Sequence, residues 1–344
     1  MTIELLSTLY VQTQGASLHL DGEAIRVFLP EDSRKRILPL RRYDALVVYG
    51  HVNLSTELIS QCAADGRPIT WMSRSGRFIG RLDGSQRGNI LLRHAQHKAH
   101  MSEPARLAIA RSIVAGKLQN SRQVLLRAAR DATGRRQEAL RRAAADMAGM
   151  IPAVANGDSL DELMGIEGNG ARCYFSVFSH LISVHSDLPP LTARTRRPPT
   201  DPLNALLSFS YGLVRSLVHG AAEAVGLDPY LGFLHGIRPA KPALVLDLME
   251  EFRAPLADRF VLSIVNRRQI TSTDFDTLPG GSVSLSEDGR KTVLTQWQEW
   301  RSEGREHALL GRNVPHGLLP VAQARLLARH LRGELPSYVP WTQC

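Results

Sequence analysis

The spacing of hydrophobic and polar positions changes near Gly88. Before that point, short runs of β-branched and aromatic residues alternate with turn pairs such as Asp21-Gly22, a pattern typical of strands joined by tight turns. A capping residue at Ser55 and a stop at Gly66 indicate one short helix among the strands. The runs predict strands at 9–12, 25–29, 46–49, 69–72 and 77–82. We expect residues 1–88 to form a β-sandwich domain.

From residue 89 onward, apolar residues recur at intervals of three and four, as at Ile109, Ile113 and Val114, which predicts helices. A proline-rich segment, 188–202, cannot continue a helix and is expected to be a basic loop. The loop contains three arginines, Arg194, Arg196 and Arg197. The chain is therefore expected to be an α+β protein in which the N-terminal β-sandwich is followed by a larger all-α domain over residues 89–344.

The positive charge of the chain is concentrated in one segment. The whole sequence has 42 Lys and Arg against 33 Asp and Glu, a net charge of +9. Residues 91–150 alone have twelve basic and four acidic side chains, a local net charge of +8. Such clustering is typical of a surface that binds phosphates, although a solvated helical hairpin would have the same composition. Three of these arginines, spaced by five and three, share one side of a predicted helix: Arg122, Arg127 and Arg130.

The cysteines and the apolar runs indicate the compartment. Cys62, Cys173 and Cys344 are too few and too widely spaced for a disulfide framework or a zinc cage. No apolar run approaches the roughly 20 residues that span a bilayer, and the N-terminal residues lack the pattern of an export signal. We therefore expect a cytoplasmic protein that is neither exported nor membrane-spanning.

Glu167 falls at a position where the pattern calls for an apolar residue. Ser159 and Glu162 form a capping box that begins a helix. Steps of three and four from Leu163 reach Glu167 and then Tyr174 on one face of that helix. A carboxylate buried there without a partner would be strongly destabilising, so a metal, another cation or a polar cleft is expected opposite it. The alternative is a helix end with Glu167 in solvent.

Two further carboxylates, Asp247 and Glu250, lie on a helix that is predicted to begin after Pro242 and to continue through Arg253. At about 100° per residue, both side chains point to the side of this helix opposite its apolar face. Carboxylates three residues apart suit a divalent cation, which prefers hard oxygen ligands. The alternative is an acidic face in solvent.

An imidazole lies close to these carboxylates in the sequence. His235 is in a glycine-flanked loop, twelve residues before Asp247, and the loop leads directly into the carboxylate helix. An isolated histidine is more often a core or loop residue, so the hypothesis depends on convergence. A mixed set of imidazole and carboxylate donors suits Mg²⁺ or Mn²⁺. The four residues of this set are Glu167, His235, Asp247 and Glu250.

Four strings carry a resemblance to a known family: LMGIEGNGARCYF, RPPTDPLNALLSFSYGLV, GFLHG and LVLDLMEEFR. In this order after an N-terminal β-domain, they resemble the CRISPR-associated integrase that acquires new spacers, and QARLLARHLRGELPSYVPW resembles its type I-C form. The resemblance implies that Glu167, His235 and Glu250 are metal ligands and that Asp247 is an accessory catalytic residue. The loop before the last string departs from the family pattern at Pro239, Lys241 and Ala243.

The resemblance also implies an activity and partners. The protein would be a metal-dependent DNA endonuclease and integrase of antiviral defence. The 3′-hydroxyl of spacer DNA would attack phosphodiesters of the CRISPR repeat, and Mg²⁺ or Mn²⁺ would offset the developing charge. Expected partners are DNA, a second copy of the chain and a small ferredoxin-like CRISPR adaptation protein, with the β-domain serving dimerisation and partner contacts. The expected DNA contacts are Arg122, Arg127, Arg130, Arg194, Arg196, Arg197, Arg238 and Lys241.

Two alternatives stay open at this point. A non-catalytic DNA-binding scaffold would keep the basic segment without a metal, and a metal-dependent phosphoesterase acting on small substrates would gain nothing from the basic segment. The integrase hypothesis makes a geometric prediction about three side chains. Carboxylate oxygens of Glu167 and Glu250 and a ring nitrogen of His235 should lie within about 5 Å of a common point, because metal–ligand distances are about 2.0–2.6 Å.

Overall fold

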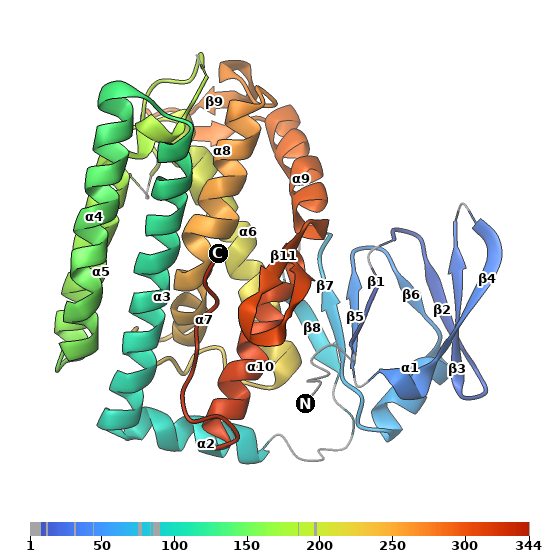
Figure 1. The fold of residues 1–344 in the computed structure, drawn as a ribbon. Coiled ribbons are helices and arrows are strands. Elements are labelled where there is room, and N and C mark those ends of the chain that lie inside the picture. Colours follow the sequence, from blue (N-terminus) through green and yellow to red (C-terminus); the bar gives the residue numbers. More distant parts are fainter. Residues whose placement is uncertain are drawn as a thin grey trace.

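The N-terminal domain contains two four-stranded sheets and one helix (Figure 1). The computed structural model describes residues 8–11, 13–30, 32–43, 45–74, 78–82, 84, 90–184, 186–195 and 198–343. The first sheet has the strand order β1-β5-β7-β8, and the second has the order β4-β3-β2-β6. The strands are β1 (Thr8–Val11), β2 (Ser17–Asp21), β3 (Ala24–Leu29), β4 (Asp32–Pro39), β5 (Ala45–Tyr49), β6 (Asn53–Leu54), β7 (Ile69–Met72) and β8 (Phe78–Leu82).

The predicted β-domain is confirmed, but its strands are not simply joined by hairpins. β1, β5 and β7 pair in parallel, whereas β8 pairs antiparallel with β7. Parallel neighbours need a crossover connection, and α1 (Thr56–Ala64) lies in the connection from β5 to β7. The side chain of Ser55 caps α1 by accepting the N–H of Leu58 (3.3 Å), as the sequence predicts.

One hydrophobic core joins the two sheets. Leu18 and Ile25 of the second sheet, Leu46 of the first sheet and Leu58 of α1 are fully buried in the same cluster. Full burial of a leucine or isoleucine side chain contributes about 1.5–3 kcal/mol. The helix therefore stabilises both sheets at once, which makes the N-terminal domain a single folding unit.

The second domain is mainly helical, as predicted, but it is not all-α. Two antiparallel pairs of short strands lie among its helices: β9 (Phe275–Thr277) with β10 (Val283–Leu285), and β11 (Gly304–His307) with β12 (Arg312–Pro315). The α-helices are α2 (Ile90–Met101), α3 (Glu103–Arg130), α4 (Gly134–Asn156), α5 (Leu160–Ser176), α6 (Pro202–Val225), α7 (Ala243–Met249), α8 (Arg259–Asn266), α9 (Glu287–Ser302) and α10 (Leu319–Leu331). The predicted domain boundary at 88/89 lies outside the described residues. No helix in the described part of the chain is long and apolar enough to cross a bilayer.

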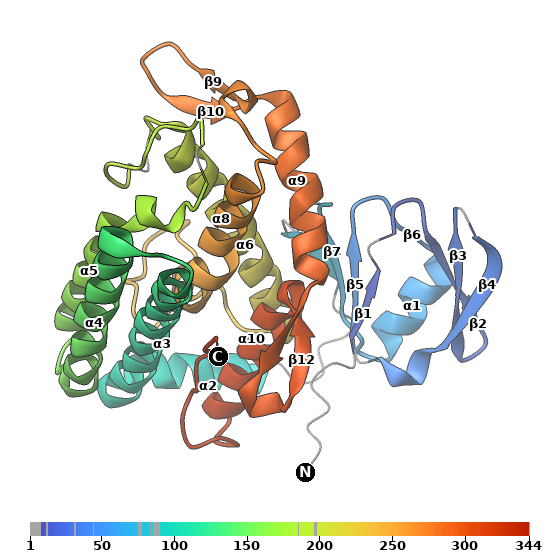
Figure 2. The ribbon, with the colours of Figure 1, turned by 45° about the horizontal axis from the view of Figure 1, so that its top comes forward.

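The β-domain packs against the helical domain through its first sheet. α3, α4 and α5 form a layer on the far side of the helical domain, while α6 runs through its middle and contacts β7 and β8 (Figure 1, Figure 2). A Cβ atom at Gly220 of α6 would lie 2.2 Å from Cε of Met72, so α6 lies directly against the side chain of this β7 residue. The guanidinium of Arg301 on α9 lies 4.6 Å from the ring centre of Tyr49.

The segment that follows α7 changes its helix type. α7 ends at Met249, a 3-10 turn covers Glu250–Phe252, and a π-helix covers Arg253–Asp258 before α8 begins. The prediction of one regular helix from Pro242 through Arg253 is therefore wrong beyond Met249. Wider π-type turns shift the directions of the side chains relative to a regular α-helix and are frequent at functional sites.

Candidate functional site

Glu167 and Glu250 meet on one ammonium group. Lys117 of α3 is buried, and its Nζ forms ion pairs with Oε1 of Glu167 on α5 and with Oε2 of Glu250 (2.6 Å). The partner that the sequence calls for opposite Glu167 is thus a lysine from another helix, and Glu167 is not free in solvent. Two carboxylates brought together in this way would repel each other if no cation lay between them.

Glu250 is buried in contact with two positive charges. Its side chain is 3% exposed, and Nε of Arg253 donates to its Oε2 at 2.8 Å. Burial by itself raises the pKa of Glu250, but the charges of Arg253 and Lys117 outweigh burial and lower it to about 2. Glu250 is therefore ionised at neutral pH, which is the form that a metal ion requires of a carboxylate ligand.

Asp247 orients His235 and its loop. This buried carboxylate accepts the backbone N–H groups of Phe233 (2.5 Å), Leu234 (3.0 Å) and His235 (2.9 Å). It also accepts a hydrogen bond from Nδ1 of His235 (2.7 Å), which leaves Nε2 of the imidazole for another partner. A Cβ atom at position 232 would lie 2.6 Å from Oδ2 of Asp247, so the close approach of the loop requires Gly232.

The four candidate residues therefore form two pairs of contacts rather than one ligand set. Glu167 and Glu250 share Lys117, while Asp247 holds His235. The expectation that the oxygens of Asp247 and Glu250 lie together stays a prediction. Among the described residues, no group of three or more His, Cys, Asp and Glu side chains is placed to hold a metal ion.

The chemistry of these donors still suits a divalent cation. Two carboxylates already share one cation, and an imidazole with Nδ1 bonded to a carboxylate has the arrangement typical of a metal-ligating histidine. His235 lies close enough to Glu250 to lower its pKa. Lys117 would have to withdraw its ammonium for a metal to bind both Glu167 and Glu250. The predicted convergence on one point within about 5 Å stays a prediction.

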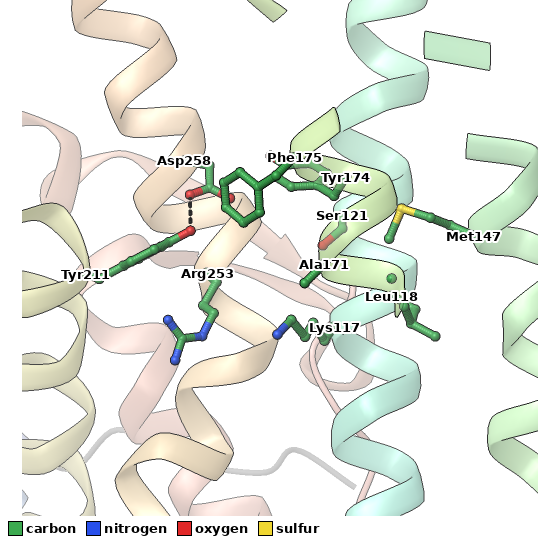
Figure 3. A pocket seen from close by; sticks show the side chains of 11 residues that line it. Lys117, Leu118, Ser121, Met147, Ala171, Tyr174, Phe175, Tyr211, Arg253 and Asp258 are labelled. Carbon is green, nitrogen blue, oxygen red and sulfur yellow. Dashed lines mark hydrogen bonds between the residues drawn. The ribbon is translucent and has the colours of Figure 1, made fainter. Parts of the chain in front are cut away.

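An open basic cavity of about 740 Å³ adjoins this site. His235 and Tyr211 contribute to its wall, together with four cationic side chains, Arg194, Arg215, Lys241 and Arg253. A smaller cavity of about 20 Å³ lies behind Lys117 and Arg253, whose charged ends point toward the same space (Figure 3). There the hydroxyl of Tyr211 donates to Asp258 at 2.7 Å, and burial raises the pKa of Asp258 to about 6. The charge of the larger cavity suits an anionic substrate such as a phosphodiester.

The expected DNA contacts occupy different environments. Arg127 and Arg130 are exposed at the end of α3, but Arg122 is partly buried and donates to Gln119 of its own helix (3.4 Å). Arg122 is therefore less accessible than Arg127 and Arg130, and the predicted shared DNA-facing side of the three arginines stays a prediction. Arg194 donates to Asn204 (2.7 Å) and Ser208 (3.0 Å) of α6, so it holds the loop in place.

The remaining expected contacts lie around the loop between α6 and α7. Arg238 is exposed, and the partly buried Lys241 contributes to the wall of the larger cavity. Arg196 and Arg197 lie outside the described residues. The DNA-binding role of the whole set stays a prediction.

Lys117 is the functional residue that the sequence analysis missed. It follows Ile113 by four residues and Val114 by three, so it lies on the same buried stripe of α3. A buried lysine needs a partner as much as a buried carboxylate does. A search for oppositely charged residues on two buried stripes would have paired them.

These observations define a class of protein: a two-domain α+β protein whose helical domain combines a cation-bridged acidic site with a basic cavity. Residues 9–299 match the family model described as CRISPR associated protein Cas1. The chain belongs to this family, which confirms the family part of the resemblance; its type I-C form stays a prediction.

Relatives and solved structures agree with this assignment. The chain is 45% identical over 338 residues to the CRISPR-associated endonuclease Cas1 1 of Moorella thermoacetica, and the match covers 98% of each chain. A casposase bound to an integration product has a similar fold, with a TM-score of 0.77 at 21% identity over 97% of this chain and 98% of that chain. A chain of a partial Cas6-RT-Cas1–Cas2 complex has a TM-score of 0.79 at 23% identity over 98% of each chain.

Proposed function

We propose that the protein is a metal-dependent DNA endonuclease and integrase of CRISPR adaptation, which inserts spacer DNA into a CRISPR array. One observation carries the proposal: two carboxylates from α5 and the α7–α8 segment converge on a single cation beside His235 and a basic cavity. The relative from Moorella thermoacetica is named an endonuclease, and the casposase of similar fold is bound to an integration product. Both names support DNA as the substrate.

Glu167, His235 and Glu250 would hold Mg²⁺ or Mn²⁺. When bound, this ion supplies Lewis-acid activation of the phosphodiester that the 3′-hydroxyl of spacer DNA attacks. The protein residues around it position the substrate. Asp247 keeps Nε2 of His235 directed away from the loop backbone, and the cations of the larger cavity hold phosphates by charge-assisted contacts. No covalent protein–DNA intermediate is required.

The proposed partners are a second copy of the chain and a small ferredoxin-like CRISPR adaptation protein. A chain of similar fold occurs in a complex whose name includes both Cas1 and Cas2. We place the protein in the cytoplasm, where CRISPR arrays are located, and assign dimerisation and partner contacts to the β-domain.

The experiment that tests this function separates chemistry from binding. The purified protein is incubated with a spacer-like DNA and a plasmid carrying a CRISPR repeat, with Mg²⁺, Mn²⁺ or excess EDTA. Glu167→Gln and His235→Ala should abolish strand transfer while DNA affinity stays within several-fold, because most affinity comes from phosphate contacts elsewhere. Glu138→Gln and His97→Ala change exposed residues of the same types and should retain activity.

The outcomes discriminate among the three hypotheses. Strand transfer that persists in EDTA would contradict the metal site. DNA binding without any metal-dependent cleavage or transfer would favour the scaffold. Hydrolysis of small phosphoesters without salt-sensitive DNA binding would favour the phosphoesterase. A loss of DNA affinity in step with activity in folded Glu167→Gln would contradict the division between binding and chemistry.

A further inference from the structure

A second basic cavity lies on the helical domain, separate from the candidate site. It has a volume of about 560 Å³, within the roughly 300–1,000 Å³ of ligand pockets. Its wall is formed by residues from the end of α3, from the start of α4, from α8, and from the corner between α9 and β11. None of its lining residues borders the larger cavity beside His235. Five arginines line it, Arg127, Arg136, Arg259, Arg267 and Arg305, against two acids, Asp131 and Glu303.

Arg259 shows that these positive charges are not balanced within the protein. Burial, together with the charges of Arg305 and Arg127, lowers the pKa of Arg259 to about 10. Glu303 opposes this effect only in part. Within the described part of the chain, no carboxylate lies within 4 Å of a guanidinium nitrogen of Arg127, Arg259 or Arg267. Like charges that share a partly buried space destabilise the protein, and an anion bound between them would remove the repulsion.

Neutral donors and an aromatic ring complete the cavity. Ser183 and Ser263 contribute to its wall. Trp300 is 6% exposed, and its buried Nε1–H has no hydrogen-bond partner among the described residues. The guanidinium of Arg259 lies 5.8 Å from the ring centre of Trp300, which holds it over one face of the indole. Arginine donates two parallel hydrogen bonds to a phosphate, so this arrangement suits phosphate oxygens.

We propose that this second cavity binds the phosphodiester backbone of a nucleic acid strand away from the candidate catalytic site. α3 carries residues of both regions: Lys117 belongs to the acidic site and Arg127 to the cavity. Ten residues of α-helix span about 15 Å, and one strand of B-DNA advances about 3.4 Å per nucleotide. A polyanion can therefore reach both regions within about four or five nucleotides, which favours nucleic acid over a separate acidic protein segment. The inference rests on the proposed function for the source of the phosphates.

The first test uses an inorganic probe. Arg127→Gln/Arg259→Gln removes two charges of the cavity, and Arg141→Gln/Arg142→Gln removes two exposed charges of α4 that do not line it. Tripolyphosphate, compared with NaCl of equal ionic strength, should raise the melting temperature of the wild type and of the α4 control but not that of the cavity variant. Without phosphate, the cavity variant should melt at or above the wild-type temperature, because repulsion is relieved. If it does not fold, Arg267→Gln at an exposed position of the wall replaces it.

The second test uses DNA. Affinity for a duplex and for a single strand is measured by fluorescence anisotropy across a series of NaCl concentrations. The cavity variant should bind about tenfold more weakly. Its plot of log affinity against log salt should be shallower by about 0.9 per lost phosphate contact on duplex and about 0.7 on single strand. The α4 control should keep most of the wild-type affinity and slope.

Any one of three results would overturn the inference. Unchanged DNA binding together with lost binding of polyglutamate would assign the cavity to an acidic protein partner. Unchanged binding of DNA, phosphate and polyglutamate would make the arginines a solvated cluster. The proposed function fails independently of this inference. If Glu167→Gln retains full strand transfer, the proposed function is wrong, but the cavity variant should still bind DNA more weakly than the wild type. The converse result is that strand transfer requires Glu167 while the DNA affinity of the cavity variant depends on salt as in the wild type. That combination would refute this inference and leave the proposed function intact.

Discussion

Two adjacent glutamates divide the centre of the helical domain into a charged and a neutral region. Glu250 and Glu251 are 3% and 1% exposed. Glu250 contacts Lys117 and Arg253, and its pKa is lowered to about 2. Glu251 accepts hydrogen bonds from neutral donors only among its described contacts: the Tyr338 hydroxyl (2.5 Å), the Trp341 N–H (2.6 Å) and the Gln323 amide (3.0 Å). Burial raises its pKa to about 8, and these donors offset burial only in part.

The comparison shows that, when two carboxylates are equally buried, the charge of their partners decides whether they are ionised. The Glu250 carboxylate is ionised and already contacts the ammonium of Lys117. A metal that replaced this ammonium would again place a cation beside an ionised carboxylate. The Glu251 region ties the C-terminal segment to α3, because Asn120 donates to the carbonyls of Glu251 (2.8 Å) and Trp341 (2.9 Å) and accepts the N–H of Gln343 (2.8 Å). The neutral region thus stabilises the turn that presents Glu250.

The largest loss of stability is expected when Glu250, in the charged region, is replaced by its neutral amide. Glu250→Gln leaves Arg253 without its carboxylate and Lys117 with Glu167 alone, so it should destabilise the protein by about 3–5 kcal/mol and abolish strand transfer. Glu251→Gln replaces a mostly protonated acid with a neutral amide and should cost about 1 kcal/mol at pH 7. Urea denaturation measures both values. Equal costs for the two variants would contradict the division into charged and neutral regions.

Removal of the lysine should have the next largest effect. Without its ammonium, Glu167 and Glu250 repel each other, although Arg253 still contacts Glu250, so Lys117→Met should destabilise the metal-free protein by about 2–3 kcal/mol. Mn²⁺ should then raise the melting temperature more than in the wild type, because no ammonium competes for the carboxylates. Lys98→Met, at an exposed position of α2, is the matched control. A Mn²⁺ response no larger than that of the wild type would show that Lys117 does not hold the place of the ion.

Local signals made much of the fold predictable. The Ser55 cap of α1 and the Ser159 cap of α5 appear where the sequence places them, although the Glu162 carboxylate accepts the N–H of Asp158 and not that of Ser159. Both depend on residues within four positions of each other, so they need no knowledge of the rest of the chain. The charge argument for Glu167 also predicted correctly that a partner lies opposite.

Long-range contacts account for what the sequence did not reveal. The parallel pairing of β1 with β5 and the ion pair across the 50 positions from Lys117 to Glu167 appear only when the chain is folded. The change to 3-10 and π turns after Met249 also has no signal in the sequence pattern, which predicts one regular helix through Arg253. The second basic cavity combines residues of α3, α8 and β11, which no single motif contains.

The pH dependence of stability should distinguish the two glutamates. The folded pKa of Glu250 lies below 4.5, so its stabilising effect is complete above about pH 4.5 and is lost as the pH falls toward 2. The folded pKa of Glu251 lies above 4.5, so its favourable protonation is complete below about pH 4.5 and is lost as the pH rises toward 8.

Glu251→Gln should therefore flatten the decline in wild-type stability at neutral pH, by on the order of 1–2 kcal/mol between pH 6 and 8. Asp258 also loses stabilising protonation as the pH rises, but its pKa is about 6. Most of its contribution is therefore lost below the range from pH 6 to 8. Urea denaturation at fixed pH values gives the two curves. Parallel curves for the wild type and Glu251→Gln would mean that Glu251 is already ionised at pH 6.

The smallest expected effect concerns a single hydroxyl of the neutral region. Tyr338→Phe removes the O–H that donates to Glu251 and that accepts from Gln323 (3.0 Å), but Glu251 keeps its bonds to Gln323 and Trp341. The cost should be about 1 kcal/mol, seen in urea denaturation and as faster proteolysis of the C-terminal segment. Strand transfer should change less than twofold, because the contacts of Glu250 are untouched. Tyr230→Phe, at an exposed position, should change neither quantity. A large loss of strand transfer in folded Tyr338→Phe would show that the neutral region positions Glu250 through more than the backbone, and the two regions would then have to be treated as one.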